Sequence, residues 1–109
     1  MPDVIGPFEQ AVLLALIHLG EDAYGRAVLN EVQRRLNRDV SAGAVYATLE
    51  RLEEKELVSS KLAPGTALRG GRARRYFVPT SAGLRALTDA RSAIERLWAG
   101  FARPLKVRA

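Results

Sequence analysis

The sequence predicts a mainly α-helical fold with one small β-hairpin, and three features indicate it. Apolar residues recur at helical spacing through the first half of the chain. From Leu57 to Val78, strand-forming residues flank a segment rich in glycine and arginine, as in a hairpin. Helical spacing then returns from Leu84 to Phe101. A chain of 109 residues is long enough for one hydrophobic core.

Composition and charge restrict the classes of function. Cysteine is absent, so disulfides, thiolate metal sites and cysteine nucleophiles are excluded. The longest apolar run, Ala11 to Ile17, is far shorter than the roughly 20 residues of a membrane span, which predicts a cytoplasmic protein without a membrane partner. The net charge is +5, and six basic residues but no acidic residue lie between Leu57 and Thr88. Such a segment indicates a polyanionic partner, although an anionic membrane surface would attract it too.

Two helices are expected after a leader of residues 1–6. The first runs from Phe8 to Leu19 and is apolar on nearly every face. Because apolar faces are buried in folded proteins, we expect this helix to be covered on nearly all sides. In so small a protein this predicts that a partner subunit covers its second face. The second helix is expected to be capped by Asp22 and to end around Asn37.

The third helix is the one around which the chain is organised. Ser41 is a suitable N-cap, and Val45, Leu49 and Leu52 form an inward stripe with Ala42. The other face presents residues that are small, aromatic or acidic: Gly43, Tyr46, Ala47, Glu50 and Glu54. A short capped helix with one face turned outward suits a DNA recognition helix, although the same pattern alone also fits an ordinary surface helix.

The hairpin and the last helix complete the fold. Strands are expected at Leu57–Leu62 and Arg74–Val78, joined by a basic, glycine-rich tip. Thr80 should cap a final helix from about Ser81 to Ala102, whose two adjacent apolar seams predict a homodimer. The alternative is that this helix folds back over its own subunit. The candidate residues for the dimer interface or a ligand site are Leu13, Leu87, Ile94, Leu97, Trp98 and Phe101.

Three helices followed by a hairpin with a basic tip give the order of a winged helix-turn-helix domain. Residues 1–79 would form this domain, and residues 80–109 a dimerisation helix and tail. The chain resembles the PadR-type transcriptional regulators of the shorter branch, with one C-terminal helix. The resemblance covers about residues 8–101 and rests on AYG at 23–25, GAVYATLERLEEKELV at 43–58 and RGGRARRYFVPTSAG at 69–83.

The resemblance implies a dimer with its third helix in the DNA major groove and its wing arginines near the backbone or minor groove. The sequence departs from the family at Glu56, where glycine is usual. If that residue is left-handed, its Cβ costs about 1 kcal/mol. The candidate DNA-binding residues are Tyr24, Gly25, Ser41, Gly43, Ala44, Tyr46, Ala47, Glu50, Lys61, Arg69, Arg72, Arg74 and Arg75.

These features predict a dimeric repressor that binds a pseudo-palindromic operator in double-stranded DNA and is released by a small ligand. Trp98 and Phe101 are candidates to line a cavity for a planar aromatic effector, although ordinary interface packing explains them as well. An enzyme is not expected, because His18 is the only histidine and no nucleophile motif, metal cluster or cofactor motif accompanies it. The alternative function is a winged-helix module that binds another protein and not DNA, for which a neutral or acidic wing would be expected.

Overall fold

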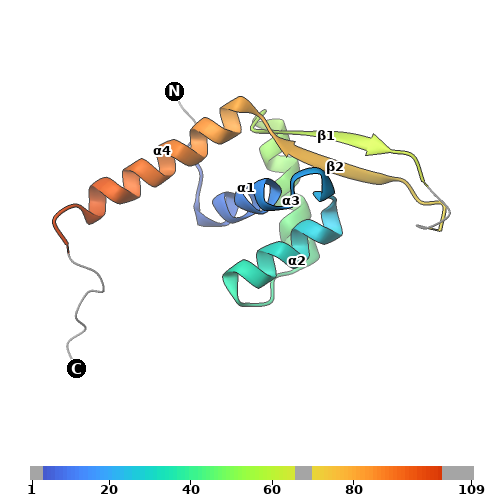
Figure 1. The fold of residues 1–109 in the computed structure, drawn as a ribbon, viewed down its shortest axis with the longest axis horizontal. Coiled ribbons are helices and arrows are strands. Elements are labelled where there is room, and N and C mark those ends of the chain that lie inside the picture. The colour runs from blue at the N-terminus through green and yellow to red at the C-terminus, as the bar shows by residue number, and fades with distance from the viewer. Residues whose placement is uncertain (1–3, 66–69, 102–109) are drawn as a thin grey trace.

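The computed structural model describes residues 4–65 and 70–101 and confirms the predicted fold class. Helices α1, α2 and α3 pack together, while the hairpin and α4 project from opposite ends of this group (Figure 1). The two strands are antiparallel, with Val58 opposite Pro79 and Ala63 opposite Arg74. In chain order the elements are α1 (Pro7–Leu19), the short 3₁₀ helix η1 (Gly20–Asp22), α2 (Gly25–Leu36), α3 (Ala42–Glu54), β1 (Val58–Ala63), β2 (Arg74–Pro79) and α4 (Ser81–Trp98).

The hydrophobic core lies between the first three helices, and α4 joins it only through its first turns. Gly83 and Ala86 are the buried residues of α4. A Cβ at Gly83 would lie 2.1 Å from the carbonyl oxygen of Leu57, so this position admits no larger residue. Among the described residues, no helix is long and apolar enough to cross a membrane. The fully buried aliphatic side chains include Val12, Leu13, Leu16, Val28, Val32, Val45, Leu49 and Leu52.

The start of α2 differs from the expectation that Asp22 caps it. Asp22 belongs to η1, and α2 begins at Gly25 after the extended residue Tyr24. The reason is a contact that sequence spacing does not reveal. Tyr24 forms an antiparallel bridge with Tyr76 of β2, and the Ala23 carbonyl accepts from the Phe77 N–H at 2.9 Å. This pairing holds the backbone extended, so the helix cannot begin earlier.

The end of α4 also differs, because the helix stops at Trp98 and not at Ala102. Ala99 leaves the helical region with ψ of 131°, and Gly100 has a φ of 89°. Glycine adopts this conformation readily, and it commonly ends helices. Phe101 therefore lies beyond the helix and does not continue its apolar seam.

The end of α3 confirms the strain anticipated at Glu56, whose φ is 62°. The Leu57 N–H donates to the Leu52 carbonyl and the Glu56 N–H to the Glu53 carbonyl, both at 2.9 Å. These two bonds form a Schellman motif, in which the position of Glu56 favours glycine.

We expect Glu56→Gly to raise the free energy of unfolding by about 1 kcal/mol, because glycine relieves the left-handed strain. Glu56→Ala removes the same charge and keeps a Cβ, so it should give no such gain. Urea denaturation of the three proteins measures both effects. A gain of equal size in the alanine variant would assign the effect to charge and contradict this account.

A half-buried carboxylate ties α1 to the C-terminal end of α3. Glu9 Oε2 lies 3.0 Å from Lys55 Nζ and 3.6 Å from Arg51 Nε, while Glu9 Oε1 accepts from the Gly6 N–H at 3.2 Å. Burial raises the pKa of Glu9, but the Lys55 and Gly6 hydrogen bonds and the two positive charges outweigh it. The pKa of Glu9 is therefore lower than its ordinary value of 4.5.

A carboxyl whose pKa is lowered on folding stabilises the protein above its unfolded pKa and loses that contribution as pH falls through the folded value. We therefore expect Glu9→Gln to cost about 1 kcal/mol at neutral pH, and the difference from the parent protein to shrink on acidification below about pH 4.5. Denaturant titrations across that range measure it. In a Lys55→Gln background, Glu9→Gln should lower the free energy of unfolding by less at neutral pH. An equal loss in both backgrounds would contradict the pairing of Glu9 with Lys55.

Candidate nucleic-acid interface

The outward face of α3 is the first part of the candidate interface. The Ser41 hydroxyl accepts from the Ala44 N–H at 3.0 Å, which confirms Ser41 as the N-cap. Val45, Leu49 and Leu52 point into the core with Thr48, whose hydroxyl accepts from Arg51 at 3.2 Å. All the residues that the helical pattern places on the outward face are exposed: Gly43, Tyr46, Ala47, Glu50 and Glu54. Ala44, another candidate DNA-binding residue, is exposed as well.

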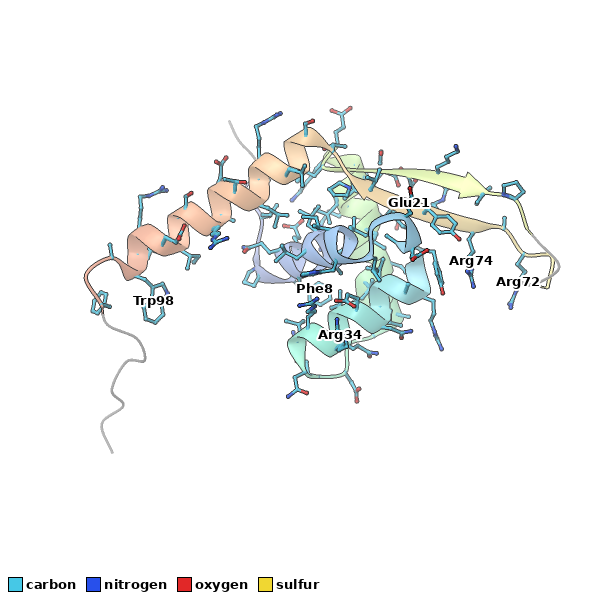
Figure 2. All side chains as sticks on the ribbon, in the orientation of Figure 1. Phe8, Glu21, Arg34, Arg72, Arg74 and Trp98 are labelled. Atoms are coloured by element: carbon cyan, nitrogen blue, oxygen red, sulfur yellow. The ribbon has the colours of Figure 1, made fainter. Side chains whose placement is uncertain are left out.

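The β1–β2 hairpin forms the second part and is called the wing below. Lys61 is exposed and lies opposite Tyr76 in the register. Arg72 and Arg75 are exposed, and Arg74 is half-buried. Arg69, also a candidate, lies outside the described residues. Arg72 and Arg74 extend from the wing toward the same side of the molecule (Figure 2).

An open groove of about 1150 Å³ separates α3 from the wing and will be called the interface groove. It brings together residues from the start of α2, from α3 and from β2. Seven of the predicted residues line it: Tyr24, Gly25, Tyr46, Glu50, Arg72, Arg74 and Arg75. Five do not, namely Ser41, Gly43, Ala44, Ala47 and Lys61, which lie on the α3 surface and on β1. The groove carries charges of both signs because Glu50 and Glu53 face the arginines.

Gly25 and Tyr46 form a close contact that the two sequence motifs do not show separately. A Cβ on Gly25 would lie 2.8 Å from Tyr46 Cε1, so the tyrosine ring occupies the space that a side chain would need. Tyr46 nevertheless remains 45% exposed and lines the interface groove. Glycine at this position therefore allows α2 and α3 to approach at the groove.

The two arginines of β2 contact different partners. The Arg74 guanidinium lies over the Tyr24 ring, 3.9 Å from its centroid, and that ring meets Tyr76 edge to face at 5.8 Å. Arg75 Nη1 donates to the Ser60 hydroxyl at 2.9 Å, and that hydroxyl donates to Glu53 Oε2 at 2.6 Å. Arg74 is thus stacked on a neutral ring, whereas Arg75 is connected through a hydroxyl to a carboxylate.

Sequence reasoning missed two charged residues that line the interface groove, Arg26 and Glu53. Both carried a usable signal. Arg26 directly follows Gly25 in the first turn of α2, and Glu53 lies three residues after Glu50 on the same face of α3. Other arginines lie elsewhere: Arg34 and Arg35 pair with Glu31 near the end of α2, at 2.8 and 2.6 Å.

The candidate interface residues on α1 and α4 divide into buried and exposed positions. Leu13 is 0% exposed within its own protomer, so its assignment to an interface is wrong. Leu14 and Ile17, each 45% exposed, are the large apolar residues of α1 that remain exposed. The candidates on and beyond α4 also differ in exposure: Leu87 packs against the core, Trp98 is half-buried, and Ile94, Leu97 and Phe101 are exposed.

A smaller, mostly apolar pocket of about 260 Å³ lies between the N-terminal segment and α4. Of the predicted residues it contains only Ile94, and its polar groups are Gln10 and Asp89. Trp98 lies at the far end of α4, outside this pocket (Figure 2). The part of the chain that the structure describes holds no group of three histidine or acidic side chains that suits a metal ion.

The Transcriptional regulator PadR-like family model matches residues 13–89. The transcriptional regulator Rv3488 of Mycobacterium tuberculosis is 39% identical over 89 residues, which cover 80% of this chain and 78% of that protein. A PadR family transcriptional regulator from Eggerthella lenta superposes with a TM-score of 0.66 at 28% identity, covering 89% of this chain and 82% of that one. Bordetella bronchiseptica BpsR shares the fold at a TM-score of 0.61 and 18% identity, covering 94% and 73%.

These relatives are transcriptional regulators and not enzymes, in agreement with the prediction that this chain is not an enzyme. The order of elements, the exposed face of α3 and the basic wing are those expected of a winged-helix DNA-binding fold. The chain belongs to the PadR-like family of transcriptional regulators.

Proposed function

We propose that this protein is a dimeric repressor that binds a pseudo-palindromic operator through α3 and the wing. The observation that supports it most strongly is the interface groove, where the exposed face of α3 and three wing arginines border one open space. Guanidinium groups bind phosphate oxygens with favourable geometry. A duplex that docks α3 in its major groove brings its backbone against these arginines.

Base recognition on α3 relies on small side chains. Gly43, Ala44 and Ala47 are exposed, so the helix can approach the base edges closely and contact thymine methyl groups. None of them offers the bidentate hydrogen bonds by which arginine reads guanine. Specificity therefore depends on DNA shape and half-site spacing, with Tyr46 and Glu50 as the main polar side chains.

Dimerisation brings two copies of α3 to one duplex. The apolar side chains that a partner would cover are Leu14 and Ile17 of α1 and Ile94 and Leu97 of α4. None of these four residues lines the interface groove, so pairing through them leaves both grooves open. Most of α4 projects from the end of the molecule opposite the tip of the wing (Figure 1). Two recognition helices in a symmetric dimer contact half-sites about 34 Å apart.

A planar aromatic effector releases the repressor from DNA in this proposal. Trp98 lies at the end of α4, close to the exposed Leu97 and Phe101, where an aromatic ligand can stack in the dimer. In BpsR, DNA binding is regulated by 6-hydroxynicotinic acid, an aromatic compound. Quenching of the single tryptophan tests this, and an absence of quenching across a broad panel of planar compounds would contradict it.

A mobility-shift titration over salt tests DNA binding itself. A mixed-sequence duplex of about 30 base pairs is long enough for both recognition helices of a dimer. We expect a shifted complex whose log affinity falls linearly with log salt concentration, because phosphate contacts release counterions. A protein that binds only another protein gives no shifted complex at low salt, which is the outcome that would favour the alternative module.

A further inference from the structure

We propose that Tyr24 is a positioning residue that fixes the Arg74 guanidinium for a DNA phosphate, acting through its ring and not through its phenol. The inference rests on the proposed DNA binding and assigns a role within it. Tyr24 precedes α2 and Arg74 begins β2, so this contact joins the helical domain to the wing at the edge of the interface groove.

The stack leaves the polar edge of Arg74 available. With its guanidinium carbon 3.9 Å from the ring centroid, Arg74 uses the face of its guanidinium, whereas its N–H donors point outward in the plane of that group. Within the described residues, the Arg74 guanidinium makes no hydrogen bond and no ion pair. A phosphate can therefore bind Arg74 without displacing its present partner.

Arg75 provides the contrast. It donates to Ser60, and the Ser60 hydroxyl donates to the Glu53 carboxylate. A phosphate that binds Arg75 must compete with the Ser60 hydroxyl and the nearby Glu53 carboxylate, or share the guanidinium with them. Arg74 is thus the arginine of β2 that is held in place and ready for an anion.

The Tyr24 ring is itself held from two sides. Its backbone bridges to Tyr76, and the Tyr76 ring meets it edge to face at 5.8 Å. A fixed ring restricts the long arginine side chain before DNA arrives, which lowers the conformational entropy lost on binding. These contacts involve the ring and the backbone, so the phenol hydroxyl plays no part in positioning Arg74.

A double-mutant cycle on DNA affinity tests this, using Tyr24→Leu, Tyr24→Phe and Arg74→Ala with the mixed-sequence duplex at fixed salt. We expect Tyr24→Leu to weaken binding about tenfold and Tyr24→Phe to remain within about twofold of the parent, because phenylalanine keeps the ring face. In the Arg74→Ala background, Tyr24→Leu should cause no further loss.

The cycle separates positioning from general destabilisation, because a loss of fold would weaken binding in either background. Equal losses from Tyr24→Leu with and without Arg74 would overturn the inference. So would a Tyr24→Phe variant as weak as Tyr24→Leu, since that result assigns the role to the hydroxyl. If the parent protein fails to bind any duplex, the proposed function itself fails, which is a different result from either of these.

Discussion

Replacing Arg72 and Arg75 by alanine should weaken DNA binding by roughly two orders of magnitude at moderate salt and flatten its salt dependence. In the proposed dimer the double variant removes four guanidinium groups that line the two interface grooves. Each lost phosphate contact lowers the salt slope by about one, so the slope should fall by on the order of three to four. Fluorescence anisotropy with a labelled duplex at several salt concentrations gives both quantities.

The matched control for this variant is Arg34→Ala with Arg35→Ala, which lowers the net charge equally. These arginines pair with Glu31 near the end of α2 and do not line the groove. The control should bind with nearly the parent salt slope. If its salt dependence falls as much as that of the wing variant, DNA affinity depends on the net charge of the protein and not on the wing arginines.

Leu97→Glu should convert the proposed dimer into a monomer and reduce operator affinity by roughly two to four orders of magnitude. Leu97 is 73% exposed on α4, and a charge buried in an apolar interface without a partner is strongly destabilising. A monomer engages one half-site at a time and loses the effective concentration that links the two. Sedimentation and operator binding measured on the same protein test both parts of the prediction.

Leu36→Glu is a suitable control, since it places the same acidic group on an exposed leucine of α2 away from α4. It should remain dimeric and bind the operator. A Leu97→Glu protein that is still a dimer would show that the interface lies elsewhere, whereas a monomer with full operator affinity would remove the need for a dimer.

Local patterns in the sequence were sufficient to predict most of the helices and strands. Ser41 and Thr80 cap helices as expected, and each hydroxyl accepts from a backbone N–H three residues later. The period of α3 separated its buried and exposed residues correctly, because one helix face packs on the core. The left-handed Glu56 was anticipated only because the family resemblance places glycine there.

The errors concern contacts between distant segments. Asp22 looked like a cap, but pairing of Tyr24 with β2 delays the start of α2. Leu13 fell on the second apolar face of α1, yet α4 returns over that face and buries it near Gly83. Side-chain periodicity describes one element at a time and does not show which neighbour covers which face.

In the interface groove, too, the sequence predicted individual residues but not the contacts between distant segments. The sequence identified the wing arginines by their charge, but it could not show that Arg74 stacks on Tyr24, fifty residues earlier, or that Ser60 connects Arg75 to Glu53. Arg26 and Glu53 were absent from the predicted site, although Arg26 directly follows Gly25 and Glu53 shares the face of α3 with Glu50.

Selection of bound duplexes from a random pool tests most directly whether two copies of α3 read one double helix. We expect enrichment of an inverted repeat whose half-sites lie about 10 base pairs apart, centre to centre. Enrichment of a single asymmetric half-site, or of no sequence beyond the starting pool, would contradict the paired arrangement on which the proposed repressor depends.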